Sequence, residues 1–212
     1  MAQNTSHAVM AQRVEPRDSL DFFPTPPWAV RALCEYIIDP IYLPYSSDLT
    51  VLEPACGAGD MARGLRDYFD RVTCSDVEPR GVGERRDFLL ERYQPDEFNW
   101  VITNPPFNLA EEFVSEGLRV GSHGVAILAR TTFAESVGRY ERLFKVTPPA
   151  IVAQFCERVP MVKGRLDATA STATGYAWFV WRRRGRREET LFRWLPPCRK
   201  RLERASDYEA AQ

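Results

Sequence analysis

The sequence predicts a single α/β domain built on a doubly wound, mostly parallel sheet of seven strands, with an antiparallel strand at its edge. Three observations support this prediction. Short apolar strands alternate with helical stripes along most of the chain, as in parallel sheets covered by helices. Residues 125–129 are apolar throughout, as expected of a strand covered on both faces. The length of 212 residues suits one full-sized domain with short extensions.

The elements follow from the apolar pattern in chain order. Residues 1–20 are polar and without apolar periodicity, and we expect a flexible N-terminal arm there. The first helix is expected at about 26–38, with Thr25 as its N-cap and Pro26 as its first helical residue. Further helices are expected at about 60–69, 109–118 and 134–144. The expected strands cover 49–54, 71–75, 98–103, 125–129, 150–156 and 176–181, and residues 86–89 are expected to be the end of a very short third strand or the loop after it.

Charge is distributed unevenly along the chain. The formal net charge is −1, but residues 182–204 contain ten Lys or Arg against three Glu. Such asymmetry indicates a nucleic-acid contact or, equally, a solvated tail with no partner. We therefore expect a globular domain at 21–182 and a basic C-terminal extension at 183–212. The long loop at 160–175, between the last two expected strands, is rich in Thr, Ala, Ser and Gly, and loops of this length are usually functional or disordered.

Cysteine and apolar content limit the compartment and the chemistry. The five cysteines are scattered and form no C-x-x-C pair, which argues against a disulfide framework and against a zinc site. With two histidines, the chain offers few candidates for histidine catalysis. No apolar run is long enough to span a membrane, and the N-terminus lacks a signal-peptide core. We expect a cytoplasmic protein that binds neither a metal nor a membrane.

A glycine turn after the first strand predicts a cofactor site. Gly57 and Gly59 lie in a G-x-G-x-x-A pattern, and Asp76 follows seventeen residues after Gly59, at the end of the next strand. Glycines let the backbone approach a ligand, and such a carboxylate can accept two ribose hydroxyls. Plain turn glycines and a helix-capping Asp76 are the structural alternatives. Glu53 favours a cationic ligand, such as the ammonium of a methionine moiety, over the pyrophosphate of NAD.

A rigid corner follows the fourth expected strand. Asn104-Pro105-Pro106-Phe107 comes directly after residues 98–103, and the prolines cannot extend a strand ladder. Ligands bind at the carboxyl ends of strands in open α/β sheets. The side-chain oxygen of Asn104 and the carbonyl of Pro105 offer two acceptors to a planar NH2 group, and Phe107 offers a ring for stacking. The structural alternative is a tight turn with a core phenylalanine.

Three segments together resemble a known family. Phe23-Pro24-Thr25-Pro26-Pro27, Glu53-Pro54-Ala55-Cys56-Gly57-Ala58-Gly59 and Asn104-Pro105-Pro106-Phe107 are similar, in this order, to motifs of class I S-adenosylmethionine-dependent methyltransferases of the DNA adenine-N6 type. Residues 21–181 resemble small phage-type or orphan members. The resemblance implies a Rossmann-like fold, S-adenosylmethionine as the cofactor and DNA as the partner.

The resemblance also implies roles for individual residues. Glu53 would lie near the methionine ammonium, Asp76 at the ribose hydroxyls and Asp87 at the cofactor adenine. The implied cofactor site comprises Thr25, Pro26, Glu53, Pro54, Ala55, Gly57, Gly59, Asp76, Asp87, Phe88 and Asn104. The implied catalytic residues are Asn104, Pro105, Pro106 and Phe107, and substrate contacts are expected from Phe107, Lys163 and Arg165.

Other functions share parts of this pattern. The same chemistry could act on RNA adenine or on a glutamine amide in a protein. A nicotinamide-dependent oxidoreductase or a non-catalytic nucleotide-binding module would match the glycine turn alone. Larger family members insert a target-recognition domain, and this chain has no room for one. Target recognition is therefore expected from the 160–175 loop, the basic segment or a partner, and a duplex substrate would have to flip its base.

Overall fold

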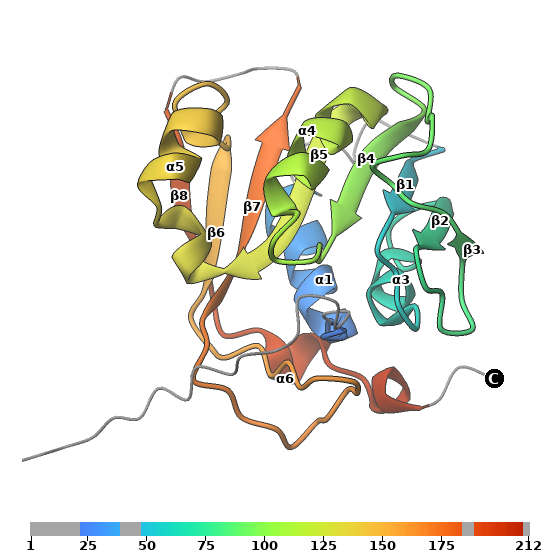
Figure 1. The fold of residues 1–212 in the computed structure, drawn as a ribbon. Helices are drawn as coiled ribbons and strands as arrows, with labels where there is room; N and C mark the ends of the chain where they lie inside the picture. Colours follow the sequence, from blue (N-terminus) through green and yellow to red (C-terminus); the bar gives the residue numbers. More distant parts are fainter. Residues whose placement is uncertain (1–21, 39–47, 184–188, 210–212) are drawn as a thin grey trace, which may run out of the picture.

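An eight-stranded sheet forms the centre of the molecule (Figure 1), in the order β3-β2-β1-β4-β5-β7-β6-β8. The computed structural model describes residues 22–38, 48–183 and 189–209. The predicted N-terminal arm lies outside the described residues. In chain order the strands are β1 (Thr50–Glu53), β2 (Arg71–Asp76), β3 (Glu84–Arg85), β4 (Phe98–Thr103), β5 (Gly121–Arg130), β6 (Ile151–Phe155), β7 (Tyr176–Arg182) and β8 (Leu191–Leu195).

Strand β1 lies between two parallel neighbours, which brings the predicted motifs together. It pairs with β2 on one side and β4 on the other, with Leu52 opposite Thr73 and Val101. The carboxyl ends of the three strands therefore lie next to one another at one edge of the sheet, where open α/β sheets bind ligands.

Strand β7 is antiparallel, as predicted for the last two expected strands. It pairs antiparallel with both β5 and β6 and so lies between them. The α/β class and the mostly parallel sheet with an antiparallel pair towards one edge are confirmed. The third strand is two residues long, Glu84–Arg85, and residues 86–89 form the loop after it, which is one of the two expectations for that segment.

The prediction of seven strands is wrong by one, because the basic segment contributes strand β8. Residues Leu191–Leu195 pair in parallel with β6 at the edge of the sheet. Only the last of the five is buried, so the segment lacks the continuous apolar run of a central strand. After β8, helix α6 (Arg199–Leu202) packs on helix α1 (Pro27–Leu33). A last 3₁₀ turn, η5 (Ala205–Tyr208), carries the buried Asp207, which pairs with Arg31 of α1.

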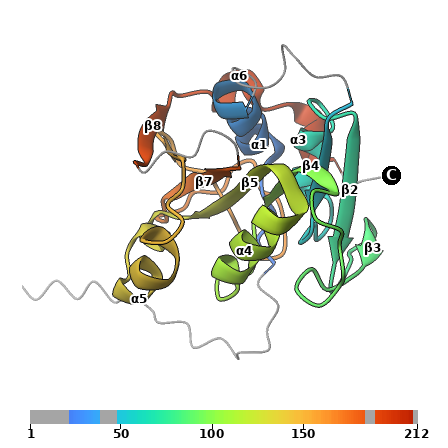
Figure 2. The ribbon, with the colours of Figure 1, turned by 90° about the horizontal axis from the view of Figure 1, so that it is seen from above.

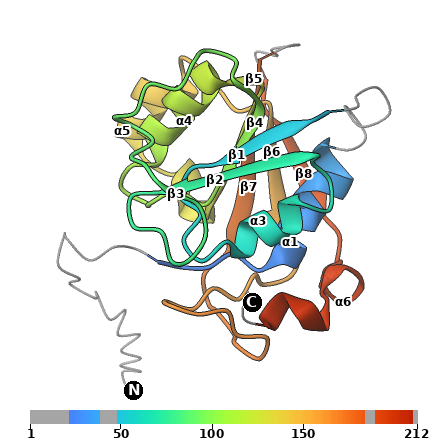
Figure 3. The same cartoon turned by 90° about the vertical axis from the view of Figure 1, so that its right-hand side faces the viewer.

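Helices cover both faces of the sheet (Figures 2 and 3). One layer holds α1, its π-helical continuation η1 (Cys34–Ile38), α3 (Asp60–Leu65) and α6, around a core that includes Trp28, Trp100 and Trp178. The other layer holds η3 (Thr131–Ala134), α4 (Ala110–Val120), α5 (Val137–Arg139) and η4 (Tyr140–Phe144), around Phe113 and Phe179.

Many charges of the basic segment are neutralised within the molecule. The intramolecular pairs are Arg183 with Asp96, Arg199 with Glu203, Arg201 with Glu35 and Arg204 with Asp67. Three of these acids come from other parts of the fold. These four described arginines therefore help to attach the segment to the domain, so their charge is weak evidence for a nucleic-acid surface.

Candidate active site

A cavity of about 980 Å³ opens at the carboxyl ends of β1, β2 and β4. It joins all three sequence motifs. The lining residues come from the segment before α1, the glycine turn, the loops after β2 and β3, and the corner after β4: Phe22, Phe23, Pro24, Thr25, Glu53, Pro54, Ala55, Cys56, Gly57, Asp60, Met61, Asp76, Val77, Glu78, Arg80, Asp87, Phe88, Leu89, Leu90, Asn104, Pro106, Phe107, Asn108, Leu109 and Phe113.

In the glycine turn, Gly57 and Gly59 have left-handed backbone conformations, and the Asp76 carboxylate binds the backbone of the turn. Gly57 has φ +51° and Gly59 has φ +82°, conformations that L side chains rarely adopt. The Gly57 N–H donates to Asp76 Oδ2 over 2.8 Å, which ties the turn to the end of β2. A Cβ on Gly57 would lie 2.4 Å from Phe22 Cε2. Gly59 does not line the cavity; its missing side chain makes room for Val82 instead.

Glu53 is a fully buried carboxylate, and one of its two oxygens accepts no hydrogen bond from the described residues. Its Oε1 accepts from Thr103 Oγ1 at 2.6 Å and from the Ala55 N–H at 3.3 Å. Its Oε2 has no hydrogen-bond partner among the described residues. Burial raises the pKa of this carboxyl well above its ordinary value, against the lowering effect of the Thr103 hydroxyl. Since the residue lines the cavity, a cationic donor in the cavity would satisfy the free oxygen.

Two further carboxylates face the cavity from the next strands. Asp76 ends β2 and receives a second backbone bond from the Glu78 N–H, at 2.8 Å to Oδ1. Asp87 follows β3, and its Oδ1 accepts the Leu89 N–H over 2.9 Å. The adjacent Phe88 is buried against Phe113, so it forms an apolar floor beneath these acids. Hydroxyl and amine donors of a nucleoside suit this set of acceptors.

The Asn104 corner presents an acceptor of its own. The Asn104 Nδ2 donates to the Phe23 carbonyl over 2.9 Å, which orients the amide. Its Oδ1 is buried and has no partner among the described residues. The Leu109 N–H closes the turn onto the Pro106 carbonyl at 2.9 Å. Pro105 is buried and does not line the cavity, whereas Pro106 does. A stiff corner thus holds one free amide oxygen at the cavity.

Phe107 lies between an aromatic ring and an arginine. Its ring centroid is 5.8 Å from that of Phe23, with the planes tilted by 41°. The guanidinium carbon of Arg130, the last residue of β5, lies 4.2 Å from the Phe107 centroid. The sequence singled out Phe107 but missed Arg130, although the end of a central parallel strand was a signal that could have identified it.

The predicted cap of α1 is wrong. Pro26, not Thr25, is the N-cap, and the helix begins at Pro27. Pro26 has φ −58° and ψ 131°. Pro26 directly precedes Pro27, and a residue before a proline is disfavoured in helical backbone, so the helix cannot begin at Pro26. Thr25 lines the cavity and turns its hydroxyl towards Met161 Sδ at 3.9 Å, while Pro26 lies outside the lining.

The 160–175 loop reaches the site through its first residues. Met161 contacts both Thr25 and Asn104, at 3.9 and 3.8 Å from Sδ. The sequence contained no signal for this role of Met161. Lys163 and Arg165 are exposed and do not line the cavity, and Arg165 pairs with Asp167 at 3.2 Å. The structure therefore does not bring these two predicted substrate contacts into the cavity itself.

Solved structures of methyltransferases share this architecture. A type I restriction-modification methyltransferase subunit from Streptococcus thermophilus matches with a TM-score of 0.59 and 11% identity, over 92% of this chain and 51% of that one. A candidate RNA methyltransferase from Pyrococcus horikoshii matches with a TM-score of 0.50 and 15% identity, over 80% of this chain and 90% of that one. The fold is that of the class I methyltransferases. This chain thus spans about half the length of the Streptococcus subunit.

These likenesses concern the fold alone, because the identities are low. The chain matches no protein-family model and no curated protein at a significant level. Within the described ranges, no three His, Cys, Asp or Glu residues are grouped to hold a metal ion. None of the helices described is long and apolar enough to span a membrane.

Proposed function

We propose that this protein transfers a methyl group from S-adenosylmethionine to the exocyclic N6 amine of adenine in DNA. The observation that carries the proposal is the Oδ1 of Asn104, held at a proline corner in the same cavity as the Oε2 of Glu53, because neither oxygen has a partner among the residues that the structure describes. One free oxygen suits a reacting amine and the other suits an ammonium.

The cofactor half of the cavity fits S-adenosylmethionine. The buried Glu53 carboxylate would hold the methionine ammonium, since a charge-assisted hydrogen bond would satisfy its free oxygen. Asp76 would accept the ribose hydroxyls and Asp87 the adenine amine. Gly57 lines the cavity, and its missing side chain leaves room for the Phe22 ring that also lines it. When bound, the cofactor supplies a methyl group on a sulfonium, which is a strong electrophile.

Asn104 is the residue that would activate the substrate. The lone pair of the adenine amine is delocalised into the ring, so this nitrogen is a poor nucleophile. Hydrogen bonds accepted from both N–H groups localise electron density on the nitrogen. The Asn104 Oδ1 would accept one of them. The Pro105 carbonyl is the predicted second acceptor, but Pro105 lies outside the cavity lining, so this second bond would require the corner to shift when the base binds. The bond from Nδ2 to Phe23 keeps the amide oriented, so the acceptor needs no rearrangement at the moment of reaction.

Phe107 would receive the target base. Its ring lies at the corner, next to Asn104, and base–aromatic stacking contributes roughly 1–3 kcal/mol. In a duplex the amine is engaged in base pairing, so the adenine must leave the helix to reach this position. Pro106 holds the corner stiff. We place the enzyme in the cytoplasm, where its five cysteines, none of which forms a disulfide, stay reduced.

The buried carboxylate also argues against a nicotinamide-dependent oxidoreductase. A pyrophosphate next to Glu53 would place two anions together in a site of low polarity. RNA adenine and a protein glutamine amide remain the alternatives for the same chemistry. Methyl transfer to each kind of acceptor distinguishes them from DNA.

The test is methyl transfer with a radiolabelled methyl donor. Purified protein is incubated with labelled S-adenosylmethionine and with unmethylated DNA, RNA or a protein extract, and the DNA and RNA are digested to nucleosides. We expect label in N6-methyladenine from DNA. Label confined to RNA or protein would refute the DNA assignment, and no transfer to any acceptor would refute methyltransferase activity.

The role of Asn104 is tested by Asn104→Ala. We expect turnover to fall at least about 100-fold, the effect of removing one preorganised polar group at a reacting centre. Affinity for S-adenosylmethionine should stay close to that of the wild type. Gln94→Ala, which removes an exposed amide in the loop before β4, is the matched control. Equal turnover in the two variants would contradict the role of Asn104.

A further inference from the structure

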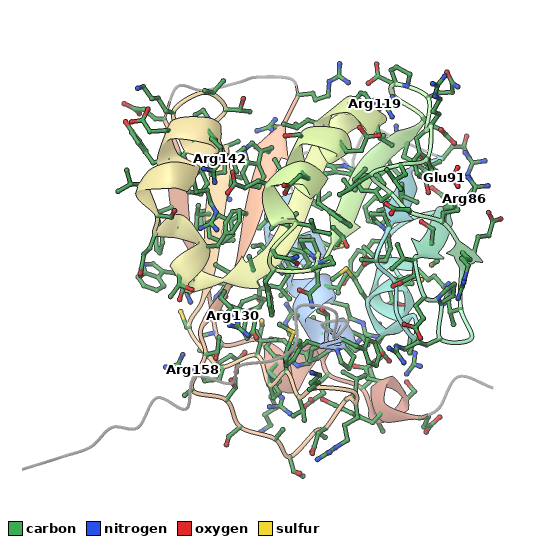
Figure 4. All side chains as sticks on the ribbon, viewed as in Figure 1. Arg86, Glu91, Arg119, Arg130, Arg142 and Arg158 are labelled. Carbon is green, nitrogen blue, oxygen red and sulfur yellow. The ribbon has the colours of Figure 1, made fainter. Side chains whose placement is uncertain are left out.

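Two arginines, Arg130 and Arg158, lie at the same end of the sheet (Figure 4), and Arg130 contacts Phe107 of the proline corner. Arg130 ends β5 and is paired with Tyr176, the first residue of β7. Arg158 follows β6, and its Nη1 lies 3.3 Å from the position that a Cβ on Gly175 would take. Gly175 directly precedes Tyr176. The two guanidinium groups therefore approach the same short stretch of backbone, next to the catalytic corner.

Neither arginine has an acidic partner in the part of the chain that the structure describes. Both are exposed. The Arg130 guanidinium lies over the Phe107 ring, and this contact does not neutralise its charge. Other arginines labelled in Figure 4 are different: Arg142 pairs with Glu111 and Arg119 with Glu116. Two uncompensated guanidinium groups near one another leave a positive potential at this edge.

The contact with Phe107 leaves the N–H groups of Arg130 available to bind an anion. A guanidinium that stacks on a ring uses its face, while its N–H donors remain available in its plane. Such a planar fork matches the oxygens of a phosphate group. The ring that orients Arg130 is also the ring proposed to stack the target base, so an anion bound by Arg130 would lie beside that base.

We propose that Arg130 and Arg158 form a binding site for the phosphodiester backbone next to the target adenine. This inference rests on the proposed function. It places the contact with the DNA backbone at the same end of the sheet as the Asn104 corner, where the target base would react. It also accounts for a nucleic-acid contact without the basic C-terminal segment, in which four of the described arginines pair with acids of the same chain.

The experiment measures binding of a fluorescent DNA duplex between about 50 and 200 mM salt, concentrations over which phosphate contacts change affinity strongly. The variants are Arg130→Gln, Arg158→Gln and the double variant. Each lost phosphate contact should lower the slope of log affinity against log salt by about 0.9. We therefore expect a decrease of about 0.9 for each single variant and about 1.8 for the double one. Arg142→Gln removes the same charge from an ion-paired site and should keep the wild-type slope.

Two further measurements separate this site from a structural role. Affinity for S-adenosylmethionine and the thermal midpoint should not change in any of these variants. Arg130→Lys keeps the charge and should recover most of the slope. A double variant whose slope equals that of Arg142→Gln overturns the phosphate site even if the protein methylates DNA. A wild-type protein that binds no DNA overturns the proposed function as well. Failure of the phosphate site alone can therefore be distinguished from failure of the proposed function.

Discussion

Replacing Glu53 by glutamine tests the cofactor site with a change of charge at nearly constant shape. The side-chain oxygen of the introduced amide can still accept from the Thr103 hydroxyl and the Ala55 N–H, so the turn should keep its structure. The substitution removes the negative charge of Glu53. This carboxyl group is 0% exposed, and one of its oxygens has no partner among the described residues. We expect weaker binding of S-adenosylmethionine without a loss of folding stability.

The magnitude follows from the hydrogen bond that is lost. A hydrogen bond to a charged group contributes about 1.5–3 kcal/mol, and every 1.4 kcal/mol changes affinity tenfold. The dissociation constant should therefore rise roughly 10- to 140-fold in Glu53→Gln. Stability of the ligand-free protein should stay equal or rise, because the variant no longer buries an ionisable group without a cation.

Titration calorimetry with two ligands makes this test specific. S-adenosylhomocysteine carries the same ammonium as the cofactor, so Glu53→Gln should weaken both to the same extent. Methylthioadenosine lacks the amino-acid portion, so its affinity should be the same in variant and wild type. Equal affinity of wild type and variant for S-adenosylmethionine would refute the ammonium assignment, and an equal loss for methylthioadenosine would show that the cavity had been distorted.

The same residue predicts a pH dependence. The pKa of Glu53 is raised in the ligand-free protein, so the neutral form is favoured as pH falls towards the ordinary value of 4.5. The stability that this protonation contributes is present at low pH and is lost as pH rises through the raised pKa. A bound ammonium favours the ionised form instead. Affinity should therefore increase as pH rises through that range, and this dependence should be absent in Glu53→Gln.

Two other substitutions test how the fold holds the site. Asp207→Ala removes one of the two carboxylates that pair with the buried Arg31, which keeps Asp67. We therefore expect a loss at the low end for a buried pair, about 3 kcal/mol in the free energy of unfolding and roughly 6–12 °C in the thermal midpoint. Gly57→Ala forces a side chain into left-handed backbone, at about 1–2 kcal/mol, and displaces Phe22; we expect lower stability and weaker cofactor binding by calorimetry.

Each of these substitutions has a control in the same molecule. Glu84→Gln breaks an exposed ion pair with Arg86 and should change stability by less than about 1 kcal/mol. Gly81→Ala meets the same backbone cost at φ +87°, but its Cβ would point into open space. If Gly81→Ala and Gly57→Ala lower cofactor affinity equally, the contact with Phe22 is not what shapes the cavity. A thermal midpoint unchanged in Asp207→Ala would refute the stabilising role of the Arg31 pair.

The parts of the site that the sequence predicted are those with local physical causes. Prolines cannot donate to a ladder, so the end of β4 and the corner at Asn104 were visible in the residues themselves. Gly57 and Gly59 mark backbone that other residues avoid, and the structure gives both of them positive φ. The order of strand and helix patterns likewise predicted the fold class. The resemblance to methyltransferases added the expectation that these separate segments share one cavity.

The rest depends on contacts between residues distant in sequence. Met161 reaches Asn104 from a loop with no local signal. Arg130 meets Phe107 because β5 pairs beside β4, which the sequence order alone does not specify. Strand β8 was missed because it is exposed at an edge and surrounded by arginines that suggested a solvated extension. The bonds of those arginines with acids elsewhere in the chain are visible only in the folded protein.

The 160–175 loop links the surface to the reacting centre. The Gly164 N–H donates to the Phe22 carbonyl at 2.9 Å, and Arg199 of α6 donates to the Ala168 carbonyl at 2.6 Å, so the loop is held from two sides. Its Met161 touches Asn104. A nucleic acid that displaced this loop would therefore also disturb the surroundings of the amine acceptor. If the proposed function holds, nucleic-acid binding at the cavity mouth would be coupled to the position of Asn104 through this loop.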